Sequence, residues 1–89
     1  MNDLLKFWDL VNKTFDPEDI ELAAEEWGFE TERYTKENLS KLAKEEIDPI
    51  FYDLISFVMD AFGIDNLGDI ADMLYSIGLD DERVAELLD

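Results

Sequence analysis

A large excess of acid limits what this chain can fold into. Of its 89 residues, 24 are Asp or Glu, seven are Lys or Arg and none is His, so the formal net charge is -17. Folding brings these like charges together, and their repulsion opposes the compact state. The chain therefore needs a substantial apolar core in order to fold.

The composition supplies material for such a core. Hydrophobic residues make up 47% of the chain and include two Trp and six Phe, whereas disordered segments are poor in aromatic residues. A chain of 89 residues is long enough for one domain with one core, so we expect a single acidic domain over residues 1–89. The absence of Cys excludes disulfides and thiolate metal sites.

Hydropathy favours a cytoplasmic protein, in the host cytoplasm if the gene belongs to a phage. The longest apolar stretch, residues 49–64, is interrupted by Asp53, Ser56 and Asp60 and is shorter than the roughly 20 residues that a membrane span needs. The first residues, 1–6, lack the basic region and long apolar run of a secretory signal.

The first third of the chain has the apolar period of helices. One face of the first segment carries an apolar residue every three or four positions: Leu4, Trp8, Val11 and Phe15. Asp16 is a good N-cap, Pro17 suits the first helical position and Gly28 suits a left-handed C-cap. These signals predict a second helix over residues 17–27.

The middle of the chain predicts two more helices. Thr35 can cap a third helix, whose inward residues are expected to be Leu39, Leu42, Ala43 and Ile47. The pair Asp48 and Pro49 repeats the stop-and-restart signal of Asp16 and Pro17, which places a separate helix at about 49–62. Because this helix is the most apolar, we expect it at the centre of the domain.

The end of the chain uses one junction twice. Phe62-Gly63-Ile64-Asp65 and Ile77-Gly78-Leu79-Asp80 each predict a glycine C-cap followed by an acidic N-cap. Two short helices are expected, at roughly 66–77 and 81–88, with these inward residues: Leu67, Ile70, Ala71, Leu74, Val84, Leu87 and Leu88. No segment alternates like a strand, so the fold class is all-α: a small bundle of five to six short helices around a central apolar helix.

The acid is concentrated in two blocks. Residues 14–32 contain eight acids and no base, and residues 45–82 contain eleven acids and no base. Helical residues three or four apart have Cβ atoms about 5–6 Å apart, so the blocks form acidic faces. The candidate partner-binding acids are Glu18, Asp19, Glu21, Glu25, Glu26, Glu30, Glu32, Asp65, Asp69, Asp72, Asp80, Asp81 and Glu82.

Two aromatic residues complete the set of candidates. Tyr34 and Tyr52 lie among polar residues and are candidate contacts with a partner, since Tyr is common at interface hot spots. The alternative is partial burial with the hydroxyl in water. Trp8 and Trp27 lie on apolar stripes and are expected in the core.

Catalytic chemistry has little support in the sequence. There is no His and no Cys, and the only serines are Ser40, Ser56 and Ser76, so we expect no enzyme and assign no catalytic residues. No cofactor or metal is expected either: counting from Asp65, the sixth residue of a Ca²⁺ loop would be Gly, and it is Ile70.

One segment resembles a known family. Leu54–Ile64, with Val58-Met59 and Phe62-Gly63-Ile64, is similar to the end of the second helix of acyl carrier proteins, which are small, acidic and helical. That family carries its prosthetic group on a serine in an Asp-Ser-Leu triplet, and the matching position here is Asp48. The resemblance therefore implies no carrier chemistry in this chain.

Rows of carboxylates can present a phosphate-like pattern to a protein that binds nucleic acid. We therefore expect a non-enzymatic acidic inhibitor that binds a basic nucleic-acid-binding enzyme or complex by DNA mimicry. It would resemble, in size and composition, the anti-restriction, anti-CRISPR and nuclease-inhibitor proteins of phages and mobile elements. Direct binding to nucleic acid or an anionic membrane is disfavoured by the charge.

Two other interpretations of the acid stay open. The acidic faces can be ordinary solvated surface, as on most amphipathic helices, including in a salt-adapted organism. Alternatively, the chain is a protein-interaction or assembly module, including a homodimer, whose acidity serves solubility.

Overall fold

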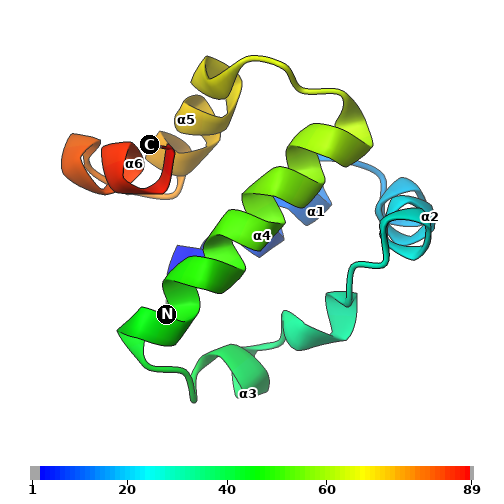
Figure 1. The fold of residues 1–89 in the computed structure, drawn as a ribbon, viewed down its shortest axis with the longest axis horizontal. Coiled ribbons are helices and arrows are strands. Elements are labelled where there is room, and N and C mark those ends of the chain that lie inside the picture. Colours follow the sequence, from blue (N-terminus) through cyan, green and yellow to red (C-terminus); the bar gives the residue numbers. More distant parts are fainter. Residues whose placement is uncertain (1–2, 89) are drawn as a thin grey trace.

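The computed structural model describes residues 3–88, which form helices joined by short connections (Figure 1). In chain order these elements are α1 (Asp3–Thr14), α2 (Pro17–Trp27), the 3-10 helix η1 (Thr31–Arg33), α3 (Lys36–Leu39), α4 (Lys44–Phe62), α5 (Leu67–Ser76) and α6 (Asp81–Leu88). The all-α class and the small helical bundle are thereby confirmed.

The longest and most central helix is α4. In Figure 1 it crosses the middle of the molecule with α1 behind it, α2 on one side, and α5 and α6 on the other. Its inner face buries Phe51, Leu54, Phe57 and Val58 completely. Phe51 stacks on Phe7 of α1 with 5.6 Å between ring centroids. The other helices add buried residues to the same core, which therefore surrounds α4.

The predicted ends of α2 are confirmed, because both caps are local. Asp16 accepts a hydrogen bond of 2.9 Å from the backbone N–H of Glu18. At the other end Gly28 adopts φ 79°, and its N–H donates to the carbonyl of Ala24. A left-handed backbone favours glycine, so the chain reverses direction at this position.

The predicted break at Asp48 and Pro49 is wrong, because α4 runs through both residues. Pro49 has no N–H to donate to the Glu45 carbonyl, and a proline inside a helix costs about 3 kcal/mol or more. Pro49 is exposed and Asp48 is half-buried, so the proline lies on the solvent side of the helix. Packing of Ile47 and Ile50 against the core offsets the cost.

The third helix is shorter than predicted, because α4 already begins at Lys44. Thr35 caps α3 as expected, accepting from the backbone N–H of Asn38 at 3.1 Å, but α3 ends at Leu39. Of the four residues expected to face inward from this helix, only Leu39 belongs to it and is buried. Ala43 is the N-cap of α4 and is exposed, and Ile47 lies within α4.

The two glycine junctions are only partly as predicted. Gly63 and Gly78 have positive φ, and Asp80 caps α6 by accepting from the N–H of Arg83 at 2.9 Å. At the first junction, however, the N-cap of α5 is Asn66 rather than Asp65. Leu67 then begins the helix on its outer side and is exposed instead of buried.

Across residues 3–88, no helix combines the length and the apolar character that crossing a bilayer requires.

Arg83 joins α6 to α4 across the bundle. Its guanidinium contacts both carboxylate oxygens of Asp48, one of them at 3.2 Å, and also pairs with Glu86 at 3.0 Å. The hydrogen bond to Asp48 raises the pKa of Arg83 above its usual value, against the opposing effect of burial. Arg83 therefore stays charged and holds Asp48 beside the proline.

Replacing Arg83 tests this link. We expect Arg83→Met to lower the free energy of unfolding by about 1–2 kcal/mol, since the pair is two-pronged but partly exposed. Urea unfolding followed by circular dichroism measures the loss. Lys41→Met is the matched control, because it removes the same charge from an exposed residue. Equal losses in both variants would show that only net charge matters.

Candidate functional site

The acids predicted to bind a partner all lie on the surface. Each of the thirteen is exposed, and none takes part in the ion pairs found in the described part of the chain, which join Lys6 to Asp3 and Arg83 to Asp48 and Glu86. Among the described residues, no Lys or Arg therefore forms a close ion pair with any of these thirteen acids.

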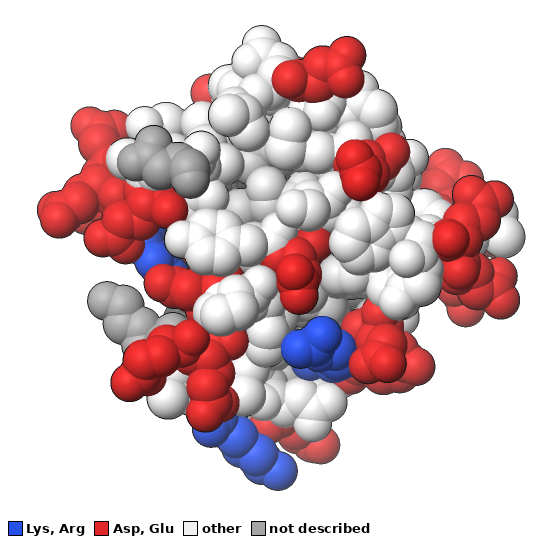
Figure 2. Space-filling model, viewed as in Figure 1, with Lys and Arg blue, Asp and Glu red and all other residues white. Residues whose placement is uncertain are grey.

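The structure separates these acids into two groups on either side of α4. The first group belongs to α2 and the connection that follows it: Glu18, Asp19, Glu21, Glu25, Glu26, Glu30 and Glu32. The second group belongs to α5 and α6 and the residues before them: Asp65, Asp69, Asp72, Asp80, Asp81 and Glu82. Figure 2 shows acid on both flanks of the molecule, with a paler strip between them.

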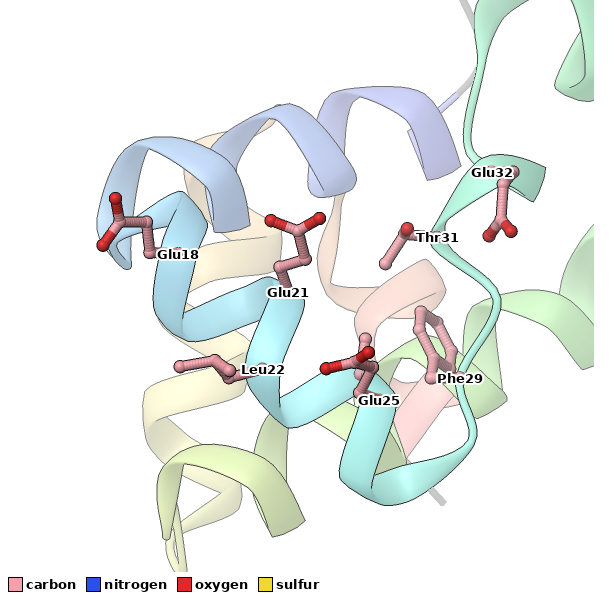
Figure 3. Close-up of a pocket in the computed structure, with 8 residues that line it drawn as sticks. Glu18, Glu21, Leu22, Glu25, Phe29, Thr31 and Glu32 are labelled. Atoms are coloured by element: carbon pink, nitrogen blue, oxygen red, sulfur yellow. The ribbon is translucent and has the colours of Figure 1, made fainter.

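The first group surrounds a pocket, which we call the α2 pocket. Its volume is about 730 Å³, and four glutamates line it together with smaller or apolar residues: Glu18, Glu21, Glu25, Glu32, Leu22, Ala24, Phe29 and Thr31. Three of the glutamates come from α2, and Glu32 faces them from η1 (Figure 3). No base lines the pocket, so it is suited to a cationic side chain.

Aromatic stacking holds the far wall of the α2 pocket in place. After the reversal at Gly28, Phe29 stacks on the buried Phe57 with 4.3 Å between ring centroids and 3° between planes. Tyr34 also stacks on Phe29, with 5.2 Å between their ring centroids. The two anchors fix both ends of the connection that carries Glu32.

The prediction that Tyr34 contacts a partner is wrong, because Tyr34 is 4% exposed. Its hydroxyl donates to the Ile50 carbonyl at 3.5 Å, so the alternative with the hydroxyl in water is also wrong. Burial raises the pKa of Tyr34 above its usual value, with Arg33 opposing the rise and Asp53 adding to it. This tyrosine is a core residue that positions the connection.

Tyr52 remains available as a contact. Its side chain is 43% exposed, and its hydroxyl donates to the Glu86 carbonyl of α6 at 3.1 Å. The ring therefore has a fixed position while much of its surface is open to a partner.

The two tryptophans differ from the prediction that both lie in the core. Trp8 is half-buried and packs on Tyr34, with 4.9 Å between ring centroids. Trp27 is 44% exposed, at the last residue of α2. One edge of its ring covers Phe57, and its indole Nε1 donates to Asp60 of α4 at 3.2 Å. Trp27 therefore belongs to the surface as well as to the core boundary.

Four exposed acids of α4 were missed as candidates. These are Glu45, Glu46, Asp53 and Asp60, and they lie between the two predicted groups. The narrow polar stripe of this helix signalled the last two, but only the bundle arrangement shows that they join the acidic surface.

The helices of the second group also influence each other electrostatically. Asp81 of α6 raises the pKa of the Tyr75 hydroxyl of α5 above its usual value. The acids at the start of α6 therefore lie near the end of α5.

The described residues offer no cluster of three or more acidic side chains that could hold a metal ion. What the site can do chemically is attract and pair with cationic groups.

Comparison with protein-family models, curated proteins and solved structures gives no match. The functional argument therefore rests on the site.

Proposed function

We propose that this protein is a non-enzymatic inhibitor that binds the nucleic-acid-binding surface of a basic protein. The observation that carries the proposal is the surface acid without compensating bases, above all the four glutamates around the α2 pocket. Nucleic acid presents a similar array of uncompensated negative charge. A groove lined with Lys and Arg attracts nucleic acid and this protein alike, because opposite charges attract.

The shape of the molecule suits this role. The Cα atoms extend over 32 × 31 × 20 Å. A bound molecule of this size would block a groove sterically as well as neutralise its charge. Suitable partners are enzymes and complexes with basic grooves, such as nucleases or the effectors of restriction and CRISPR systems. Electrostatic steering makes association with them fast, and salt slows it because the Debye length is about 8 Å at physiological ionic strength.

The assembly-module alternative has weaker support. The large exposed apolar side chains are spread over three helices. Leu22 and Trp27 belong to α2 and Tyr52 belongs to α4, whereas Leu67 and Tyr75 belong to α5 on the other side of α4. A stable homodimer normally buries a continuous apolar surface. Because α2 and α5 lie on opposite sides of α4, these residues do not form one continuous patch.

The proposal is tested by capture from a nuclease-treated lysate on the immobilised protein. We expect one basic nucleic-acid-binding protein to be retained and then released by increasing salt, with mass spectrometry identifying it. Retention of a partner that resists salt, or a concentration-dependent dimer in light scattering with nothing retained, would contradict the proposal.

A further inference from the structure

The outward surface of α4 differs from both acidic flanks. We call this surface the α4 face and define it by Trp27, Tyr52, Asp53, Ser56 and Asp60, all of which are exposed. It lies between α2 and α6, with α4 nearest the viewer in Figure 1. Figure 2, drawn from the same side, shows mostly uncharged surface there, with a few acids and one basic side chain close to them. The sequence contains no base between residues 45 and 82.

Two aromatic rings border the α4 face in fixed positions. Trp27 donates from Nε1 to Asp60, and its ring meets Phe57 edge-on at 5.7 Å and 70°. Tyr52 donates to the Glu86 carbonyl on the opposite side of α4. The polar atoms of both rings are thus satisfied within the protein, while 44% and 43% of these two residues stay exposed. Such preorganised rings lose little freedom when they bind.

Two carboxylates accompany the rings. Asp53 and Asp60 are seven residues apart on α4, about 10.5 Å along the helix axis at 1.5 Å per residue. Neither belongs to an ion pair in the described part of the chain. Arg33 and Asp53 both influence the Tyr34 hydroxyl, but they do not pair with each other.

Arginine matches this arrangement better than lysine. Its planar guanidinium pairs with a carboxylate and stacks on an aromatic ring at the same time, whereas an ammonium is a compact, strongly hydrated charge. A guanidinium over Trp27 can reach the Asp60 carboxylate, which already accepts from the indole Nε1 of that ring. A second guanidinium can pair with Asp53, which is exposed. The spacing fits two arginines seven residues apart on one helix.

We infer that the α4 face binds an arginine-bearing helix of the basic partner. This inference rests on the proposed function and specifies the chemistry of recognition. The occupant is set by charge complementarity together with the exposed rings, since an acidic or purely apolar helix would bring no cation to the negative charges of Asp53 and Asp60.

A synthetic alanine-based helical peptide with two arginines seven residues apart is the probe. In a titration at low salt followed by NMR, we expect the indole N–H signal of Trp27 to shift, while the signal of Trp8, which packs on Tyr34, stays in place. The same peptide with two lysines is expected to bind about fivefold more weakly. Equal binding of the two peptides would overturn the inference.

Paired substitutions locate the binding. We expect Asp53→Asn with Asp60→Asn to weaken the arginine peptide about tenfold. Asp9→Asn with Glu37→Gln, which removes the same charge from exposed positions on α1 and α3, is expected to change it less than twofold. Equal weakening by the two pairs would overturn the inference in favour of net charge alone.

Binding experiments with the partner captured from the lysate distinguish failure of this inference from failure of the proposed function. If that partner binds the Asp53→Asn, Asp60→Asn variant with native affinity, the inference fails and the proposed function stands. If no such partner is recovered but the arginine peptide binds as expected, the proposed function fails and the α4 face remains an arginine-binding surface.

Discussion

Reversing two charges at the α2 pocket is expected to slow association with the basic partner by about tenfold or more. The variant is Glu21→Lys with Glu25→Lys. Both residues are exposed and line the pocket opposite Glu32, so the change replaces half of its glutamates with bases. Steering by opposite charges raises association rates by about 10–10³-fold. Stopped-flow or surface-binding kinetics with the captured partner measures the change.

The control for this variant changes the same charge elsewhere. The control is Asp3→Lys with Asp9→Lys, which alters two acids of α1. Each substitution of an acid by Lys adds two charge units, so either pair changes the formal net charge from -17 to -13. We expect the α1 pair to slow association by less than about threefold. Because Glu21 and Glu25 lie beyond the first turn of α2, their reversal should not weaken that helix. Equal slowing by the two pairs would exclude the α2 pocket as the contact.

Removal of the Phe57 ring is expected to destabilise the protein most. Phe57 is fully buried and contacts three other rings: Phe29 stacked at 4.3 Å, and Trp27 and Phe62 edge-on at 5.7 and 6.3 Å. Phe57→Ala should lower the free energy of unfolding by about 3–5 kcal/mol, since a buried Phe→Ala change loses both apolar transfer and packing. Thermal and urea unfolding followed by circular dichroism measure this loss.

A smaller change at the same position provides the comparison. Phe57→Leu keeps most of the apolar volume and is expected to cost less than Phe57→Ala. The cost is still expected to exceed about 1 kcal/mol, because Phe29 loses the nearer of the two rings on which it stacks. If Phe57→Ala cost less than about 1 kcal/mol, the aromatic cluster would not be what holds the connection carrying Glu32.

Local signals predicted the ends of several helices correctly. The bounds of α2 and α6 agree with the predicted 17–27 and 81–88, because Asp16, Gly28 and Asp80 act through hydrogen bonds with residues two to four positions away. Capping depends on the chain nearby, so the sequence carries this information directly.

The errors arise where distant residues decide. The pair Asp48 and Pro49 has the local signature of a break, but Arg83, 35 residues later, binds Asp48 and the core holds Ile47 and Ile50. The burial of Tyr34 has the same origin, since its ring fills a place between Trp8 and Phe29. Periodicity identifies an apolar stripe but not which neighbour covers it.

The candidate site was predictable where it depends on local helical spacing and not where it depends on contacts between distant residues. Helical spacing placed Glu18, Glu21 and Glu25 on one face of α2, and all three line the pocket. The contribution of Glu32 depends on the reversal at Gly28 and on the packing of Phe29. The exposed ring of Trp27 and its bond to Asp60 join residues 33 positions apart, which no local pattern contains.

Competition with nucleic acid tests the central claim most directly. A fluorescent DNA or RNA bound to the captured partner would be titrated with the protein while anisotropy is followed. Mimicry predicts that the nucleic acid is released in proportion to the protein added, and that the Glu21→Lys, Glu25→Lys variant releases far less. A complex in which the partner holds the protein and the nucleic acid together would contradict the account.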